Sequence, residues 1–353
     1  EKCCWPLPAR SLKATRHLKG RRMIKFIIKT ILQFVLILLC VSFISFLLVY
    51  LAPGDPAESI LNAQGIPFTK ELLEIKRAEM GLNGSFMEQY LAWLGRIVHG
   101  DFGVTYNSGA SVWEQLVFYF PNTVYLAFYT LLATLGISLP TALYTSYHAG
   151  KPVDRFLMAG LAFLNAIPSF VMGIILILIF SVQLHWLPIQ ATANELGLVL
   201  PVITLAMIMS TRYIPQLRTA LIEVLHSPEV EGARGRGIRE GHILLHDVIY
   251  NVLPFLLTLV SLSLGSLLGG VAIIEHLFSW PGIGKMLIGV VAKRDYPLIQ
   301  GAVLFITAGV LTVNLVFQLL MVWLNPRVRL AQENPKLLPR MKRLKTSKEG
   351  SYG

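Results

Sequence analysis

Charged residues are scarce in this sequence. Only 14% of its 353 residues are Asp, Glu, Lys or Arg, whereas 54% are hydrophobic and the mean hydropathy is +0.60. A soluble domain needs much less apolar sequence to fill its core. The composition therefore excludes an ordinary soluble protein and predicts a chain that lies in a lipid bilayer.

Charge is missing most completely from six stretches. A helix must run for about 20 apolar residues to cross the hydrocarbon core of a bilayer. Five stretches are long enough, and a span in the fourth has to continue past Arg212 toward Leu217, with the arginine reaching toward a polar interface. The sequence therefore predicts an all-α integral membrane protein with six transmembrane helices. The uncharged stretches cover residues 30–54, 115–150, 156–194, 196–211, 248–274 and 296–326.

The sequence also lacks the groupings that enzymes and metal proteins need. Cys3 and Cys4 are adjacent and Cys40 lies in the first predicted span, so no disulfide framework or zinc-ligand spacing emerges. Residues 282–286 come nearest to a phosphate-binding loop, but they lack its spacing and its Ser or Thr. No acid, base or nucleophile clusters in a span. We therefore predict no catalytic residue, cofactor, metal site or nucleotide site.

Basic residues are distributed unevenly between the predicted loops. Lys and Arg favour the cytoplasmic side of a membrane in short loops. With the N-terminus inside, 24 of the 31 Lys and Arg residues fall on the cytoplasmic side and 7 on the other. The distribution predicts that both termini are cytoplasmic. It also explains the net charge of +11 by attraction to anionic lipid headgroups, so no nucleic-acid partner is expected.

The spans divide the chain into five parts. The N-terminal part is basic and unpatterned, and Met23 opens an apolar run that is too long for a cleaved signal peptide. We predict an extension outside the fold, a first transmembrane helix, an outer segment with short helices, a five-helix transmembrane core and a basic cytoplasmic tail. Their bounds are 1–22, 23–52, 53–119, 120–326 and 327–353, and the core includes a cytoplasmic loop over 218–250.

The outer segment has helix signals of its own. Thr69 precedes a charged amphipathic stretch that stops at Gly81. Ser85 and Glu88 have the spacing of a capping box ahead of an apolar, aromatic run. Two short helices are expected there. Their role is left open between a docking surface on the outer face and a packed loop that shields the rim of a pore.

The loop over 218–250 has the most specific pattern. It is long and polar, and its short helix is punctuated by Gly232, Gly235 and Gly237 before Leu253-Pro254 opens the next apolar run. Such a loop is typical of a surface that inserts into a partner.

This loop resembles that of the permease subunits of bacterial ABC importers, in the branch that imports peptides, nickel and metal-chelator complexes. Their cytoplasmic loop carries E-A-A, a later glycine and L-P, and in this branch it reads Y-V-x-x-A-R-x-K-G. Here Arg236 keeps the charge of the Lys, Glu229 replaces the aromatic residue, and Gly232 weakens the helix by about 1 kcal/mol relative to Ala. The resemblance implies an ATPase-docking coupling helix with seven site residues, namely Glu229, Glu231, Gly232, Ala233, Arg234, Arg236 and Gly237.

Further motifs extend the resemblance from Met23 to Arg329. It implies a type I permease fold that forms half of a translocation pathway in a bacterial inner membrane. It also implies a second permease subunit, two cytoplasmic ATPase subunits that supply the energy, and an extracytoplasmic substrate-binding protein. The motifs are Pro53-Gly54-Asp55-Pro56, Asp101-Phe102-Gly103, Pro121-Asn122-Thr123, Ala166-Ile167-Pro168, Trp186-Leu187-Pro188, residues 275–284, residues 295–300 and Asn325-Pro326-Arg327.

The substrate is indicated by one loop. Residues 61–67 look more like the nickel and metallophore permeases than the peptide permeases, which favours nickel or a nickel chelate, with oligopeptides or dipeptides as the alternative. A secondary transporter is less well supported, because it would need charged or broken helices at mid-membrane.

Two further features have alternative interpretations. His242 and His246 share a helix face and could hold a metal ion, but they have no third ligand nearby, which favours a solvated face. Glu275 is an acid close to a span end, and we favour an interfacial residue at the outer mouth over a functional intramembrane charge.

Overall fold

The computed structural model describes residues 9–52, 54–63, 67 and 69–324. The chain divides into two compact units, one made of residues 1–40 and 315–353 and the other of residues 41–314, and each is described by itself. The predictions for Cys3, Cys4, part of loop 61–67, the motif at Asn325 and the basic tail lie at least partly outside the described residues.

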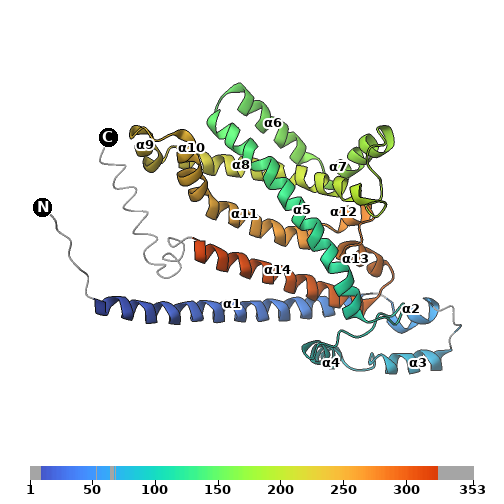
Figure 1. Cartoon of the computed structure of the whole chain (residues 1–353). Helices are drawn as coiled ribbons and strands as arrows, with labels where there is room; N and C mark the ends of the chain where they lie inside the picture. The colour runs from blue at the N-terminus through green and yellow to red at the C-terminus, as the bar shows by residue number, and fades with distance from the viewer. Residues whose placement is uncertain (1–8, 53, 64–66, 68, 325–353) are drawn as a thin grey trace. The chain divides into compact units, whose positions relative to one another are not determined.

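All regular structure in the described part is helical, apart from one isolated bridge between Val104 and Ser111. The helices are shown in Figure 1. In chain order the elements are α1 (Ala9–Leu51), α2 (Pro56–Ala63), α3 (Lys70–Glu79), α4 (Phe86–Val98), α5 (Val112–Tyr147), α6 (Pro152–Ala166), α7 (Ser169–Leu176), the π-helical turn η1 (Ile177–Gln183), the 3₁₀ turn η2 (Glu195–Leu198), α8 (Val199–Leu225), α9 (Pro228–Gly235), α10 (Glu240–His242), the π-helical turn η3 (Ile243–Val248), α11 (Ile249–Gly270), α12 (Ala272–Leu277), α13 (Ile283–Ala292) and α14 (Tyr296–Leu324).

Five helical stretches of the described chain are long and apolar enough to cross a membrane, and a bent pair brings the number to six if it counts as one span. This confirms the predicted all-α class and the number of spans. The stretches are Ile28–Leu51, Val112–Tyr147, Glu195–Leu225, Glu240–Leu268 and Tyr296–Met321, with Pro152–Ala166 and Ser169–Gln183 as the bent pair.

The helix that carries the first apolar stretch, Ile28–Leu51, extends into the N-terminal segment. α1 starts at Ala9, within the segment expected to lie outside the fold, and not at Met23. Residues 9–22 are mostly Ala, Leu, Lys, Arg and other residues compatible with a helix, and they contain no proline. The helix is therefore continuous from the basic segment into the apolar run.

The third predicted span is bent sharply rather than continuous. The bend between α6 and α7 is 100°. Pro168 has no N–H to donate, and it forces Ile167 out of the helical region, to φ −81° and ψ 124°. The uncharged run over 156–194 therefore folds as two helices that meet at Ile167-Pro168. By contrast, α8 continues past Arg212 as expected, and the Arg212 side chain is exposed.

Small polar side chains pack α5 against α8, which lie side by side (Figure 1). α5 buries a hydroxyl or methyl side chain at every fourth residue, and α8 buries Thr204 and Ser210. Small side chains let the backbones of membrane helices approach closely. The hydroxyl of Thr134 donates to the carbonyl of Thr130 at 2.7 Å, so it is satisfied within its own helix. The α5 residues at this spacing are Thr130, Thr134, Ser138 and Ala142.

Both predicted short helices of the outer segment are present. Thr69 caps α3, Gly81 follows its end with φ +68°, and Ser85 and Glu88 form the capping box of α4. A third short helix, α2, was not predicted. It begins at Pro56, where the N–H of Ala57 donates to the carboxylate of Asp55 at 2.9 Å.

An aromatic cluster holds α4 against the end of α1 within the larger unit. The ring of Phe46 makes edge contacts with Phe86 and Tyr90 at centroid distances of 5.7 and 5.5 Å. The hydroxyls of Ser42 and Tyr90 lie 2.9 Å apart. Tyr90 and Trp93 are buried, so the apolar face of α4 is the face that packs.

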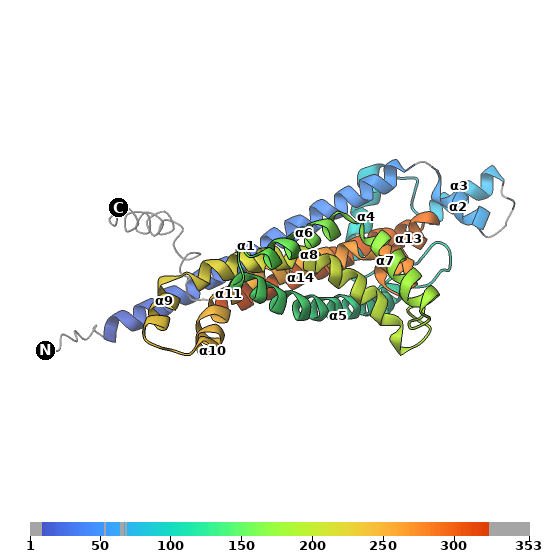
Figure 2. The same ribbon diagram turned by 90° about the horizontal axis from the view of Figure 1, so that it is seen from above.

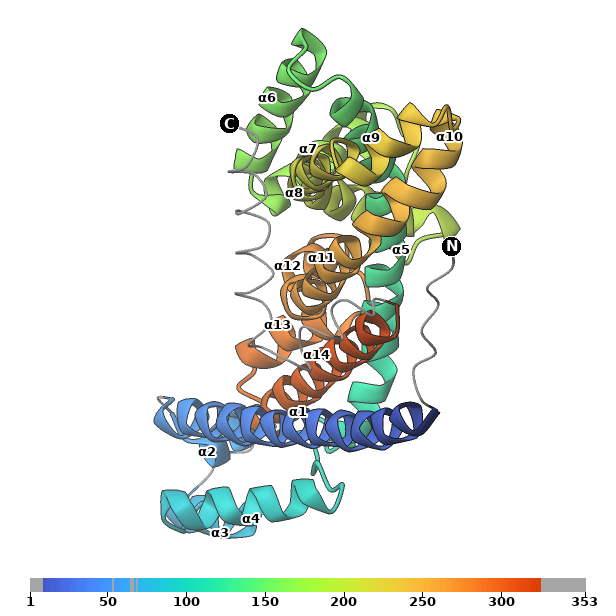
Figure 3. The same ribbon diagram turned by 90° about the vertical axis from the view of Figure 1, so that its left-hand side faces the viewer.

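The short helices of the larger unit gather at two opposite ends of its long helices. α9 and α10 lie at one end, and α2, α3, α4 and α13 lie at the other (Figure 1, Figure 2). Figure 3 looks onto the end that carries α9 and α10. The predicted coupling helix and the outer segment are therefore separated by the length of the long helices.

Candidate coupling helix and the opposite polar end

The predicted coupling helix is α9. Its start combines Pro228 at the first helical position with acidic residues in the first turn, both of which suit the unpaired N–H groups there. The hydroxyl of Ser227 accepts from the N–H of Val230 at 3.5 Å. Val230 and Ala233 are buried and attach the helix to the rest of the unit.

Gly237 terminates α9. Its N–H donates to the carbonyl of Arg234 at 2.9 Å, and the N–H of Ile238 donates to the carbonyl of Ala233 at 3.2 Å, which is a Schellman motif. Gly237 has φ +75°, a conformation that costs little for glycine but is strained for other residues. A Cβ there would meet no atom within 4 Å. Glycine is therefore needed for its backbone conformation and not for space.

Arg234 links segments on either side of it in this loop. Its Nε donates to Oε1 of Glu240 at 2.7 Å, and its guanidinium also donates to the carbonyl of Leu225 at 3.3 Å. These contacts join the end of α8, α9 and the start of α10. The sequence treated Arg234 as a docking residue, and the structure shows that it also positions the helix.

The seven predicted site residues divide into two groups. Ala233 is 2% exposed and faces inward, so its side chain anchors α9. The other six have exposed side chains or backbone, as does Gly235. The exposed face of α9 therefore carries carboxylates and guanidinium groups around a small-residue surface at Gly232 and Gly235. Such a face can form ion pairs with a partner at close approach.

A buried ion pair that the sequence did not reveal supports the same end. Arg218 of α8 makes a two-pronged contact with Asp154 of α6, at 2.7 Å from Nε to Oδ1 and 2.6 Å from the terminal nitrogen to Oδ2. The N–H of Gly150 also donates to Asp154 at 2.8 Å. Asp154 is 3% exposed. This pair fixes the start of α6 against the helix that leads into α9.

His242 and His246 stack with ring centroids 4.1 Å apart. Among the described residues, no group of three His, Cys, Asp or Glu side chains could hold a metal ion. The two rings therefore form a stacked pair on the loop after α9.

Glu275 is fully buried within the protein, beside the turn that precedes α13. Its carboxylate accepts from the hydroxyl of Thr123 at 2.6 Å and from the N–H groups of Gly284 and Lys285 at 2.8 and 3.0 Å. Those two N–H groups are the unpaired donors at the start of α13. Glu275 of α12 thus caps α13, which begins at Ile283, six residues beyond the end of α12 at Leu277.

Two motifs that lie far apart in the sequence interlock around Glu275. Asn122 donates to the carbonyl of Pro281 at 2.9 Å and accepts from the indole N–H of Trp280 at 2.9 Å. The N–H of Ile283 donates to the hydroxyl of Thr123 at 2.9 Å. A Cβ on Gly282 would overlap the Glu275 carboxylate. The sequence showed both motifs but not that α5 and the α12–α13 turn form one polar cluster.

A second buried carboxylate holds the loop before α5. Asp295 is 2% exposed and accepts from the N–H groups of Tyr106 and Asn107 at 3.1 and 3.2 Å, and from the side-chain amide of Asn107 at 3.1 Å. Burial, followed by the nearby Asp295 charge, raises the pKa of Tyr106 to about 12. The loop is thereby fixed to the start of α14.

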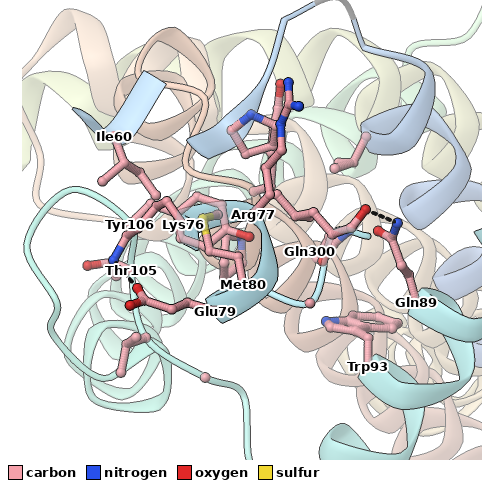
Figure 4. Close-up of a pocket in the computed structure, with 18 of the residues that line it drawn as sticks. Ile60, Lys76, Arg77, Glu79, Met80, Gln89, Trp93, Thr105, Tyr106 and Gln300 are labelled. Atoms are coloured by element: carbon pink, nitrogen blue, oxygen red, sulfur yellow. Dashed lines mark hydrogen bonds and ion pairs between the residues drawn. The ribbon is translucent and has the colours of Figure 1, made fainter. Parts of the chain in front are cut away.

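A cavity of about 910 Å³ lies beside this loop. Its walls come from the end of α1, from α2, α3 and α4, from residues 102–109 and from the first turns of α14. Figure 4 shows Arg77, Gln89, Trp93, Tyr106 and Gln300 among the side chains around it. The sequence gave no signal for a cavity, because its walls come from segments as far apart in the chain as Phe46 and Gln300.

Long apolar helices, one of them broken at a proline, define a multi-pass α-helical membrane protein. The chain belongs to the family described as the binding-protein-dependent transport system inner membrane component, which matches residues 136–330. The N-terminal component of the same transport systems matches residues 23–127. The expected resemblance to importer permeases is thereby confirmed.

Curated relatives agree with this assignment. The chain is 33% identical over 315 residues to the nickel import system permease protein NikB of Staphylococcus aureus strain USA300, which covers 89% of this chain and 95% of that protein. The corresponding protein of strain N315 is 33% identical over 314 residues, covering 89% and 94%.

Solved structures support the fold. The chain is similar to a chain from the inward-facing MetNI methionine ABC transporter, with a TM-score of 0.52, 16% sequence identity and coverage of 60% of this chain and 96% of that chain. A second crystal form of that transporter gives a TM-score of 0.51 at 15% identity. The helical core is therefore arranged as in importer permeases.

Proposed function

We propose that this chain forms half of the translocation pathway of an ATP-driven importer for nickel or a nickel chelate. The observation that carries the proposal is the 33% identity to a nickel import permease over nearly the whole length of both chains. The same relative favours nickel over the alternative of oligopeptides or dipeptides. A secondary transporter has less support, because the family is one of binding-protein-dependent systems.

The exposed face of α9 is the proposed docking surface for a separate ATPase subunit. In this proposal α9 lies in the cytoplasm, with both chain termini on the same side, in the bacterial inner membrane. The end that carries α2, α3 and α4 then faces outward, toward a substrate-binding protein. The opposite locations of α9 and these helices on the larger unit support this orientation (Figure 2).

The anchoring of α9 supports a mechanical role. Closure of two ATPase subunits on ATP would move α9, and the buried side chains of Val230 and Ala233 would transmit that movement to the core. The contact from Arg234 to the carbonyl of Leu225 links α9 directly to the end of α8. The second permease subunit would supply the other half of the pathway. The described chain itself supplies the coupling helix α9 and the membrane-spanning helices.

Co-purification with uptake measurements tests the proposal. Expression with candidate ATPase and second permease subunits should recover a complex that hydrolyses ATP and supports nickel accumulation in cells. Competition by nickel chelates and by dipeptides distinguishes the two substrate classes. Recovery of the chain without an ATPase, under conditions that preserve such complexes, would contradict the proposal. Uptake of peptide but not nickel would make peptide the substrate of the importer, and the proposed permease role would stand.

A further inference from the structure

The cavity of about 910 Å³ beside α3 and α4 has the size of a small-molecule site. Its walls combine apolar side chains, including Phe46 and Ile60, with polar groups from four separate elements. Figure 4 shows Trp93 and Gln89 approaching it from α4, Arg77 from α3 and Gln300 from α14. Nothing in the transport role described above uses this cavity.

Three side chains that line the cavity belong to buried residues and make no hydrogen bond to a described residue, and none of their polar atoms is among the fully enclosed atoms without a partner. Trp93 is 7% exposed, Tyr296 is 7% exposed and Gln300 is 5% exposed. Buried polar groups in native proteins nearly always have a partner. The polar atoms of these three side chains therefore remain accessible to water or to a bound molecule.

The cavity also carries one unbalanced positive charge. Lys76 pairs with Glu79 at 2.9 Å, and Arg77 pairs with Asp55 at 2.6 Å. Arg96 lines the cavity too, and it makes no ion pair with any carboxylate in the described part of the chain. The indole N–H and the guanidinium can only donate hydrogen bonds, and the amide and phenol can donate as well. The open groups therefore fit an anionic acceptor.

We propose that this cavity binds a small organic carboxylate, whose charged end accepts from Arg96 and from the buried donors and whose remainder packs on Phe46 and Ile60. Water can satisfy the donors when the cavity is empty. A carboxylate can displace that water without loss because it reproduces the same hydrogen bonds. Arg96 is exposed, whereas a folded partner can reach Trp93, Tyr296 and Gln300 only by inserting a single side chain. The site is independent of whether the importer carries nickel or peptides.

A matched pair of ligands tests the chemical class. The full chain, purified together with its accompanying subunits, is titrated calorimetrically with N-acetyl-trialanine and with the same peptide as its C-terminal amide. The two probes have the same shape and differ by one negative charge. The acid should bind about tenfold or more tightly than the amide, the ratio expected for one hydrogen bond to a charged group.

Matched variants test the site. Arg96→Met should weaken binding of the acid by about tenfold or more and leave binding of the amide unchanged. Trp93→Phe keeps an aromatic ring but removes the indole N–H, and should weaken binding of the acid by a smaller factor. Lys70→Met is the control, because Lys70 is exposed on α3 and does not line the cavity. Thermal unfolding of each variant shows that it remains folded.

Three results would overturn the proposal. The first is no heat from either probe at millimolar concentration. The second is equal binding of acid and amide, which would exclude a carboxylate site. The third is acid binding by folded Arg96→Met that matches the parent chain. Because all of these are binding measurements, loss of nickel uptake with intact carboxylate binding would contradict the proposed transport function and not this site.

Discussion

The two ends of the larger unit are stabilised in different ways. At one end, α9 rests on two small buried side chains, Val230 and Ala233, and its charged groups are exposed. At the other end, the carboxylates of Glu275 and Asp295 are buried and each accepts three hydrogen bonds from the surrounding backbone and side chains. The charges of α9 are presented to solvent, whereas those of Glu275 and Asp295 are enclosed.

This difference shows how one chain can combine an exposed surface for a partner, on α9, with a rigid framework around Glu275 and Asp295. An exposed charged face costs little to keep hydrated, so it can form and break ion pairs. A buried carboxylate is stable only while all its donors stay in place. We infer that the end with Glu275 moves as a fixed body, whereas α9 is free to engage another subunit.

The largest expected effect is at Glu275. Glu275→Leu leaves the N–H groups of Gly284 and Lys285 and the hydroxyl of Thr123 without their acceptor, and should destabilise the fold by about 4 kcal/mol. Thermal unfolding in detergent measures the loss. Glu195→Leu is the control, because Glu195 is exposed. Equal unfolding temperatures for the two variants would contradict the buried-cluster account.

A smaller loss of stability is expected when the buried ion pair near the α9 end is broken. Asp154→Leu leaves the Arg218 guanidinium without its carboxylate, and because Arg218 is 22% exposed, part of that cost is relieved by solvent. We expect a destabilisation of about 2 kcal/mol in the same unfolding measurement. Glu223→Leu, at an exposed acid on α8, provides the comparison. A stability unchanged from the parent would show that the pair is not needed.

Gly237 should affect function more than stability. Gly237→Val places a β-branched side chain at φ +75°, which costs about 1 to 3 kcal/mol locally and distorts the end of α9. Nickel uptake should fall at least tenfold while the amount of chain in the membrane stays the same. Gly100→Val is the matched control, since Gly100 also has a positive φ, +82°, a Cβ there meets nothing within 4 Å, and it follows α4 at the opposite end of the larger unit. Full uptake by Gly237→Val would refute the docking role of α9.

The weakest effect is a pH dependence at Tyr106. Its pKa of about 12 lies above the ordinary value of 10, so the folded chain holds this proton more tightly than the unfolded chain. The stabilisation from Tyr106 is therefore complete below pH 10 and is lost as the pH rises toward 12. Unfolding curves between pH 9 and 12 should fall less steeply for Tyr106→Phe. Parallel curves for parent and variant would contradict the buried position of the phenol.

Local patterns in the sequence predicted local structure well. The helix caps at Thr69 and Ser85, the continuation of α8 past Arg212 and the glycine that ends α9 all depend on residues close in the chain. The same physical rules that place a cap or exclude charge from a span act over a few residues. These features could therefore be predicted without knowing the rest of the fold.

Features that depend on distant partners could not be predicted. The acceptor role of Glu275 depends on Thr123 in another helix, and Asp154 gave no sign of its partner Arg218. The bend at Pro168 had a visible signal, but the long uncharged run around it favoured a continuous span. The cavity required segments from both ends of the chain to converge. Tertiary contacts decided each of these cases.

The central claim is that the exposed face of α9 docks an ATPase subunit. It is tested most directly by cross-linking in a chain whose three cysteines are replaced by serine, with a single new cysteine from Arg236→Cys on α9 or Lys70→Cys on α3. The account predicts a cross-link to the co-expressed ATPase from position 236 and none from position 70. A cross-link from position 70, or none from position 236 in an assembled complex, would contradict it.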